Sequence, residues 1–245
     1  MQQPTTSPNH KNTAELIGTY GGDESHAMSA WTSTSRDIDS VDPKTGKSKR
    51  DRIPGLLSML ASNGHHTPFE KSTLHFLCTT DIASHIHLLK HRIGTSLNGE
   101  SARYKELKDD KFYVPTDWSV SQRDDYEKFM KTALAAYHRA LQNIEVDLIQ
   151  GGMDKKLAKK RAKESARFYL PYGNQITCDV SFNFRSFYHF LKLRYHVDAQ
   201  KEIRELARTM LELVHQNGDF DETLVAFELL DKATNTLREP FDGNH

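Results

Sequence analysis

The sequence predicts an α+β fold that is rich in helices and has a small, mostly antiparallel sheet. The strongest helical signal is a run of apolar residues at helical spacing over 126–148, which ends at the glycine pair 151–152. A second, very basic helix is expected over 154–166. Over 72–80, apolar and polar residues alternate with a period of two, which indicates a strand. The expected elements do not alternate in the βαβ order of a parallel sheet.

Local start and stop signals place the other elements. Ile53-Pro54 opens a helix that Asn63-Gly64 stops, and Asp81 can cap a helix over 82–89. The glycine-bearing polar segment 93–100 indicates a loop. The remaining expectations, in chain order, are a helix beginning within 26–31, a loop over 32–51, a turn over 171–174, a strand over 177–182, helices over 184–195 and 199–214, and a strand within 220–230.

The composition limits the class of protein. The length of 245 residues suits one large domain or two small ones, and we expect a flexible tail over 1–13 and a single domain over 14–245. Lys plus Arg equals Asp plus Glu at 33 each, which argues against a general nucleic-acid binder. No run of eighteen apolar residues and no apolar leader occurs, so we expect a cytoplasmic protein without a membrane partner. Cys78 and Cys178 are too few for a disulfide scaffold and are expected to be small buried residues.

A polar segment with basic residues at both ends is the first candidate site. Lys90-His91-Arg92 precedes it, and Ser101-Ala102-Arg103-Tyr104 follows it. Backbone N–H groups in such a loop can converge on phosphate oxygens, and Arg103 can add a bidentate charged contact. A solvated turn with ordinary ion pairs explains the same composition equally well.

Two adjacent histidines, His65 and His66, form the second candidate. They follow a glycine turn and precede Thr67-Pro68-Phe69-Glu70. Adjacent side chains can face one ligand from an irregular turn, but not from a helix or a strand. From the residues alone we favour a structural role, in which they stabilise the C-terminus of the preceding helix.

The third candidate is the segment 183–196. If it is helical, one face carries four groups that can be cationic: Arg185, His189, Lys192 and His196. With no acid among them these groups repel one another, so a bound anion such as a pyrophosphate or a nucleotide would stabilise the face. The clustering of like charges favours this interpretation over a solvated helix face.

A metal site is the rival interpretation of the histidines. His87 and His91 are four residues apart and can share a helix face, whereas His85 points elsewhere. The H-E-x-x-H signature of metalloproteases is absent. The sequence also lacks the G-x-G-x-x-G and P-loop motifs, so a dinucleotide must bind outside those folds.

Taken together, the three segments resemble the flavin-dependent thymidylate synthase family. That family has a G-H-x-T-P-F-E segment, matched here by residues 64–70, and an R-H-R motif followed by a serine and an R-Y pair, matched by residues 90–104. Its downstream helix carries N-x-R-S and an L-R pair, matched here by Asn183, Arg185, Ser186, Leu193 and Arg194. The motifs occur in the family's order, and the resemblance covers about residues 15–215.

Two positions depart from the family's pattern. Lys90 stands where the family has Arg, which keeps the charge but loses the bidentate fork. The segment before Ser101 is one residue longer than in the family, so Gly99 and Glu100 have no certain counterpart.

The resemblance implies an FAD-dependent thymidylate synthase of the same fold, in which residues 14–245 form the catalytic domain. Such an enzyme methylates dUMP to dTMP with 5,10-methylenetetrahydrofolate and NADPH as co-substrates, and it is a homotetramer with sites shared between subunits. The FAD-binding residues implied are Ser33, His65, Thr67, Glu70, Arg92, Asn183, Arg185 and His189. The dUMP-binding residues implied are His87, Lys90, Glu100, Ser101, Ala102, Arg103, Arg167 and Arg194.

Within that set Arg194 is assigned the catalytic role, because an arginine against the uracil carbonyls stabilises charge that develops on the ring. Ser101 positions the substrate and is not the nucleophile, since nothing near it supplies a base. Two other classes of function stay open. One is a nucleotide- or RNA-binding module that uses the basic stretch 155–163, although no nucleic-acid partner is expected, and the other is a metal hydrolase.

Overall fold

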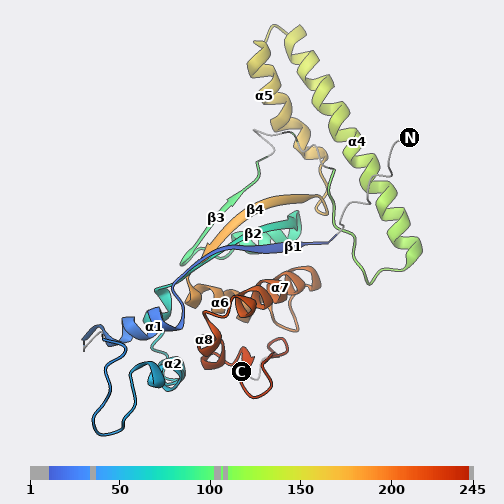
Figure 1. Ribbon diagram of the computed structural model, residues 1–245. Coiled ribbons are helices and arrows are strands. Elements are labelled where there is room, and N and C mark those ends of the chain that lie inside the picture. The colour runs from blue at the N-terminus through green and yellow to red at the C-terminus, as the bar shows by residue number, and fades with distance from the viewer. Residues whose placement is uncertain (1–10, 34–36, 102–105, 107–109, 243–245) are drawn as a thin grey trace, which may run out of the picture. The chain divides into compact units, whose positions relative to one another are not determined.

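The computed structural model describes residues 11–33, 37–101, 106 and 110–242 (Figure 1). Its helices and strands confirm the predicted helix-rich α+β class with a small antiparallel sheet. In chain order they are β1 (Thr13–Tyr20), α1 (Asp23–Ala30), α2 (Ile53–Ser62), β2 (Thr73–Asp81), α3 (Ile82–Leu89), β3 (Thr95–Gly99), α4 (Val120–Gln150), α5 (Lys155–Ala166), β4 (Gln175–Phe182), α6 (Phe184–Arg194), α7 (Lys201–Asn217), α8 (Asp221–Ala226), β5 (Leu230–Asp231) and β6 (Thr236–Leu237). Four short 3-10 helices are η1 (Trp31–Ser33), η2 (Arg50–Arg52), η3 (Thr67–Glu70) and η4 (Arg167–Tyr169).

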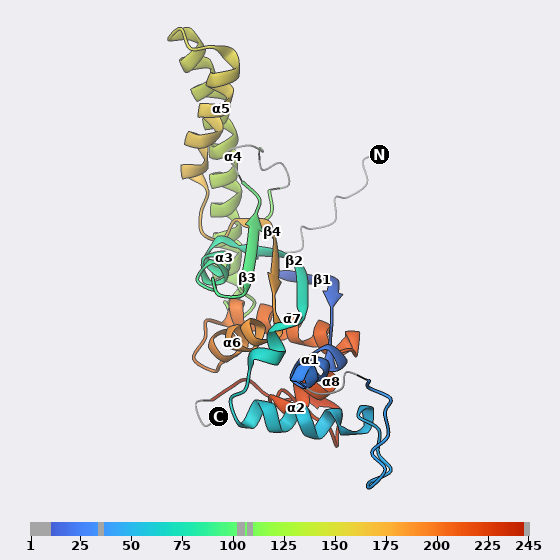
Figure 2. The ribbon, with the colours of Figure 1, turned by 90° about the vertical axis from the view of Figure 1, so that its left-hand side faces the viewer.

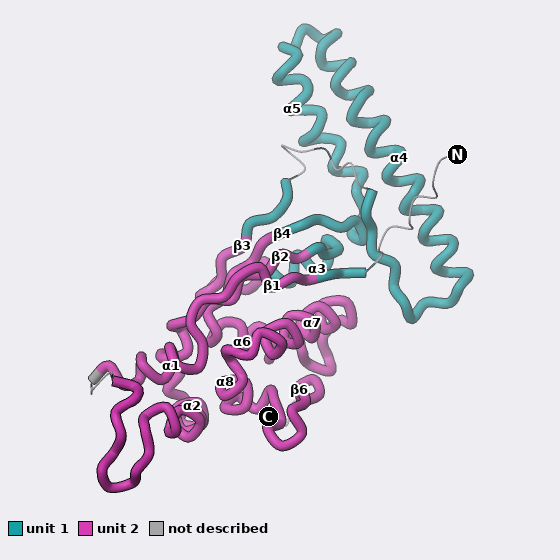
Figure 3. Tube along the Cα trace, in the orientation of Figure 1, with its two compact units in different colours: residues 1–13, 79–88, 98–178 teal, residues 14–78, 89–97, 179–245 magenta. Residues whose placement is uncertain are grey.

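The chain divides into two compact units (Figure 3). The first comprises residues 1–13, 79–88 and 98–178, and the second comprises 14–78, 89–97 and 179–245. The strands of the main sheet, in the order β1-β2-β4-β3, each begin in one unit and end in the other. The short strands β5 and β6 form an antiparallel pair in the second unit, with Leu230 opposite Leu237.

The first unit contains the two helices that the sequence predicts most strongly, α4 and α5, which lie side by side (Figure 2). The Ser119 hydroxyl caps α4 by accepting the N–H of Gln122, and the Asp154 carboxylate caps α5. Their buried seam contains Tyr137, Leu141, Ala162 and Ala166. Small alanines on α5 let the two helices approach closely, while Lys155, Lys156, Lys159 and Lys160 are exposed.

The second unit has an aromatic core that fixes the position of α6. The rings of Phe76 in β2 and Phe187 in α6 stack with centroids 5.6 Å apart. Phe182 in β4 packs against Phe190 with centroids 5.4 Å apart. All four rings are buried, so one face of α6 is held against the strands and its opposite, polar face stays accessible.

Two local predictions are wrong. Residues 95–99 form the strand β3 and not a loop, because β3 lies at the edge of the sheet, where backbone pairing on one side suffices for a polar segment. Residues 221–226 form the helix α8 and not a strand. Asp221 and Glu222 occupy its first turn, where acidic groups are favourable, and both Phe220 and Leu224 are fully buried.

The strand β1 was not predicted, because its burial alternates only weakly along Thr13–Tyr20. Of the expected tail, residues 11–13 belong to the described structure, and Asn12 donates to the Asp81 carboxylate at 2.6 Å.

No helix in the described ranges is both long enough and apolar enough to cross a membrane. The cytoplasmic location stays a prediction.

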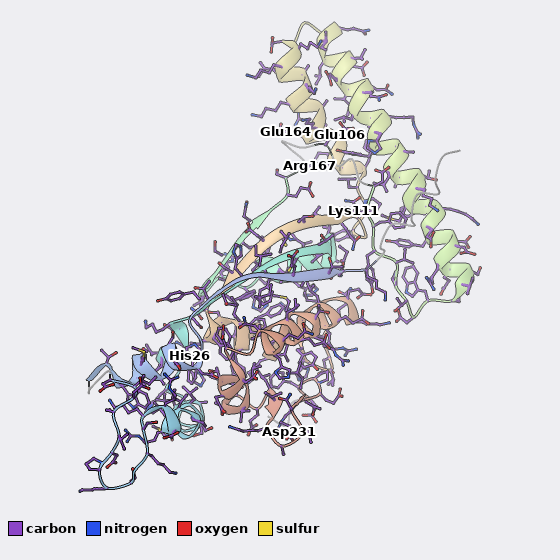
Figure 4. All side chains as sticks on the ribbon, in the orientation of Figure 1. His26, Glu106, Lys111, Glu164, Arg167 and Asp231 are labelled. Atoms are coloured by element: carbon purple, nitrogen blue, oxygen red, sulfur yellow. The ribbon has the colours of Figure 1, made fainter. Side chains whose placement is uncertain are left out.

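A chain of hydrogen bonds joins α1 to α8 through the buried His26. Figure 4 labels His26. The Thr223 hydroxyl donates to the Asp23 carboxylate at 2.5 Å and lies 2.9 Å from His26 Nδ1. Because the hydroxyl has one proton, it accepts from His26 Nδ1–H, and His26 Nε2 then accepts from the Ser72 hydroxyl at 2.8 Å. Burial raises the pKa of Asp23 to about 6 and lowers the pKa of His26 to about 4.

These two shifts have opposite effects on stability in acid. Between pH 7 and 5 the unfolded chain protonates His26, whose ordinary pKa is 6.5, while the folded chain does not, so the fold loses stability. Over the same range the folded chain protonates Asp23, whose ordinary pKa is 3.8, while the unfolded chain does not, so the fold gains stability.

Asp23→Asn should therefore make the protein more sensitive to acid. Between pH 7 and 5 we expect the variant to lose about 1 kcal/mol more free energy of unfolding than the wild type, because it lacks the compensating protonation. Urea denaturation at the two pH values measures this difference. Equal losses in both proteins would contradict the account.

Candidate functional site

A groove of about 580 Å³ opens on the polar face of α6 in the second unit. Three segments that are distant in sequence form its walls: η3 with the residue before it, the turn before β3, and α6. The lining residues are His66, Glu70, Ile93, Gly94, Asn183, Arg185, Ser186, Tyr188, His189 and Lys192. The three candidate segments of the sequence therefore meet in one place.

The turn before β3 is seated on the N-terminus of α6 by a backbone contact. Asn183 caps the helix, because its side-chain oxygen accepts the N–H of Ser186 at 2.9 Å. The backbone N–H of Asn183 donates to the carbonyl of Gly94 at 3.0 Å. Gly94 has φ +62°, and a Cβ there would lie 2.2 Å from the Ser186 hydroxyl and 2.4 Å from the Asn183 amide. Only glycine fits this position without displacing the helix cap.

The groove carries more positive than negative charge. Arg185 and Lys192 both line it, together with His189. The Arg185 guanidinium donates to the Glu70 carboxylate of η3, so an acid from another segment offsets part of the repulsion expected along this face. The pairing could not be predicted from local sequence, because Glu70 lies 115 residues away from Arg185. The expectation that His196 shares the face is wrong, because α6 ends at Arg194. The Lys192 ammonium lies 5.8 Å from the ring centre of Tyr188, which holds it close to the groove.

His91 and Arg194 form a second contact between the same two segments. Arg194 Nε donates to His91 Nε2 at 3.1 Å. The His91 ring packs edge-on against Phe190 and His189, with centroids 5.1 and 6.0 Å away. Burial lowers the pKa of Arg194 from its ordinary value. Since α3 ends at Leu89, His91 does not share a helix face with His87, and that part of the metal hypothesis is wrong.

Half of the eight residues predicted to bind a flavin line the groove: Glu70, Asn183, Arg185 and His189. His65, Thr67 and Arg92 are exposed and lie outside the lining set. Ser33 ends η1, and its side chain is outside the described part of the structure.

His66, not its neighbour His65, faces the groove. The resemblance implied His65 and not His66, so the structure places the neighbouring histidine in the lining set instead. Gly64, with φ +70°, forms the turn just before the pair. His66 Nε2–H also donates to the carbonyl of Ala61 in the last turn of α2. The predicted role at a helix C-terminus is therefore confirmed for His66, which also lines the groove. The other lining residues without a predicted individual role are Ile93, Gly94, Ser186 and Tyr188, and all four lie inside the candidate segments.

The residues predicted to bind the nucleotide are distributed over both units. Lys90 and Arg194 belong to the second unit. His87, Glu100, Ser101 and Arg167 belong to the first, where Arg167 is exposed just after α5 (Figure 4). Ala102 and Arg103 lie outside the described residues. Their assembly into one site stays a prediction.

Glu100 has a defined setting in the first unit. Its backbone N–H donates to the carbonyl of Thr177 at 2.7 Å, and its carboxylate accepts the N–H of Thr177 at 3.3 Å. This pairing places the segment that leads to Ser101 beside β4. Within the described residues no three His, Cys, Asp or Glu side chains gather in a way that could hold a metal ion.

The three meeting segments correspond to a known family of proteins. The family described as "Thymidylate synthase complementing protein" matches residues 15–217 of the sequence. The chain belongs to this family. The contacts of the groove thus come from motifs inside the matched range, and the predicted family is confirmed.

Curated relatives of the thymidylate synthase complementing family carry the name "flavin-dependent thymidylate synthase". The relative from Clostridium tetani is 31% identical over 164 residues, which is 66% of this chain and 66% of its own. The relative from Ehrlichia ruminantium (strain Gardel) is 30% identical over 209 residues, 83% of this chain and 67% of its own. The relative from Tropheryma whipplei (strain TW08/27) is 32% identical over 191 residues. The chain spans about two thirds of the length of the first two relatives.

Two solved structures are similar to the chain over most of its length. Both are of a UMP/dUMP methylase, PolB from Streptomyces cacaoi, bound with 5-Br UMP in one case and 5-Br dUMP in the other. They are 25% and 26% identical to this chain, with a TM-score of 0.68 in each case. The similarity covers 89% of this chain and 94% or 95% of the solved ones.

Gly94→Ala should destabilise the protein more than Gly64→Ala. Both glycines have positive φ, so an alanine is strained at either site by about 1 kcal/mol, but only at Gly94 does the new methyl group collide with neighbouring atoms. We expect Gly94→Ala to cost about 1–3 kcal/mol more than its control, measured as the free energy of unfolding in urea. Equal losses would show that the turn is not packed tightly on α6.

Proposed function

We propose that this chain is a flavin-dependent thymidylate synthase that converts dUMP to dTMP. The observation that carries the proposal is the groove in which three family motifs meet, through Glu70, Gly94 and Arg185. FAD is the proposed cofactor, and NADPH and 5,10-methylenetetrahydrofolate are the proposed co-substrates. The names of the curated relatives and the uracil nucleotides held by the Streptomyces cacaoi methylase support the same chemistry.

The residues of the groove fit a flavin dinucleotide. A pyrophosphate carries negative charge, and the groove offers Arg185 and Lys192 beside the capped N-terminus of an eleven-residue helix. Asn183 and His189 add further hydrogen-bonding groups. When bound, reduced FAD supplies the reducing equivalents that complete the methyl group. Tyr188 and Ile93 supply apolar surface that keeps water away from part of the ligand.

Arg194 is the proposed catalytic residue. It is partly buried, so its charge acts in a medium of lower dielectric constant than water. The negative charge that develops on a uracil carbonyl during attack would be stabilised by such a guanidinium. The dUMP phosphate would be held by Arg103 and Ser101, some of these groups coming from a neighbouring subunit of a homotetramer. A fixed phosphate orients the uracil ring for reaction.

The proposal requires no cysteine nucleophile. Cys78 and Cys178 are both buried, with 0% and 2% of their surface exposed, and neither forms a disulfide. A thiolate in such surroundings is disfavoured, because burial in apolar surroundings opposes ionisation. Both cysteines therefore contribute packing, as the sequence predicts.

An assay for dTMP with the Cys78→Ala/Cys178→Ala variant tests the proposed function and its mechanism together. The wild type should form dTMP from dUMP only when NADPH, the folate and FAD are all present. The variant should release tritium from C5-labelled dUMP at a rate within about threefold of the wild type, since alanine keeps the sites apolar. Absence of dTMP with a folded, yellow, FAD-loaded wild type would refute the function. Loss of tritium release in an equally folded and loaded variant would refute the thiol-free mechanism.

A further inference from the structure

We propose that His91 is a positioning residue for Arg194: it accepts the Nε–H of the guanidinium and directs the two Nη groups toward the substrate. The inference deepens the proposed function and rests on it. The resemblance assigns no role to His91, and neither sequence spacing nor secondary structure indicates the contact, since the two residues are 103 positions apart.

The geometry holds the acceptor atom in a fixed direction. His91 Nε2 lies 3.1 Å from Arg194 Nε. The imidazole plane is set by Phe190, which is fully buried and meets the ring at 78°, and by His189, which meets it at 68°. Since Phe190, His189 and Arg194 all belong to α6, one helix both orients the histidine and presents the arginine. The lone pair on Nε2 therefore has a defined direction relative to the guanidinium.

The chemistry of the pair suits a charge-stabilising arginine. To accept from Arg194, His91 Nε2 must be unprotonated, so the neutral ring carries its proton on Nδ1. One of the five guanidinium N–H groups is then engaged, and the four on the two Nη atoms can face a ligand. A neutral acceptor orients the guanidinium without cancelling its charge, whereas a carboxylate in this place would neutralise it. The contact thus orients the guanidinium without weakening the electrostatic stabilisation that its charge can provide.

Substitutions at His91 can separate this role from simple packing. His91→Phe keeps an aromatic ring against Phe190 but has no acceptor. His91→Gln loses the ring but places an amide oxygen at a reach close to that of Nε2. His91→Asn has the same amide with a side chain one methylene shorter. If His91 positions Arg194, the His91→Gln variant should keep its activity, whereas the His91→Phe and His91→Asn variants should lose it. If His91 only packs, the His91→Phe variant should keep its activity and the His91→Gln variant should lose it.

We expect kcat for dTMP formation to fall about 10- to 100-fold in the Phe and Asn variants, because a hydrogen bond to a charged group is lost. The Gln variant should retain at least about a third of wild-type kcat. KM for dUMP should change less than kcat, since the contact orients a group that acts on charge developed in the transition state. In an Arg194→Lys background, which has no Nε–H, His91→Phe should have almost no further effect.

Two outcomes would overturn the inference: a Phe variant as active as the wild type, or a Gln variant as impaired as the Phe variant. Absorbance of bound FAD in each purified variant establishes that the flavin site is loaded. Crystal structures of the Phe and Gln variants give a readout independent of activity, because Arg194 should be displaced in the first and retained in the second. If the wild type makes no dTMP, the proposed function fails, while the position of Arg194 in these structures still decides the inference.

Discussion

The close approach of Gly94 to the N-terminus of α6 is the constraint on which the groove depends. The carbonyl of Gly94 accepts the backbone N–H of Asn183, while the side chain of Asn183 caps the helix. Because glycine has no Cβ, the turn can lie where any other residue would collide with the cap. This contact brings the segment after His91 onto the same helix whose other groups line the groove. Without it, the motif before β3 and the motif on α6 would lose one of the two contacts described between them, the other being that of His91 with Arg194.

Charge in the groove is organised by contacts that cross long stretches of sequence. Glu70 pairs with Arg185, which limits the repulsion among the cations of α6 and fixes the direction of one guanidinium. His91 pairs with Arg194 and leaves its charge intact. Among the described residues, the helix thus presents one arginine that a carboxylate partly neutralises and one whose hydrogen-bond partner is an imidazole. The pairing with Glu70 fixes the direction of Arg185, which is proposed to bind an anion. The pairing with His91 orients Arg194 and leaves it its charge, which it needs to stabilise charge that develops on the substrate.

The sequence predicted the elements whose signals are local. The helices α2, α4, α5 and α6 were expected because each combines an apolar face with capping or stop residues, as Asp154 illustrates for α5. The edge strand β3 and the helix α8 were not, since polar edge pairing and burial by distant residues leave no periodic signal. For the groove, the motifs identified Asn183, Arg185 and His189, but no local pattern could show that Glu70 pairs with Arg185 or that His91 contacts Arg194. Such contacts depend on tertiary structure, which spacing alone does not encode.

The central claim is that the cationic face of α6 binds the flavin, and the affinity for FAD of Arg185→Ala tests it most directly. Arg208→Ala is the matched control, because Arg208 is an exposed arginine that also pairs with a glutamate but belongs to α7. Titration of each purified protein with FAD, followed by quenching of flavin fluorescence, gives the two dissociation constants. The account predicts that Arg185→Ala raises Kd about 10- to 100-fold and that Arg208→Ala leaves it within about twofold of the wild type. Equal affinities in the two variants would contradict it.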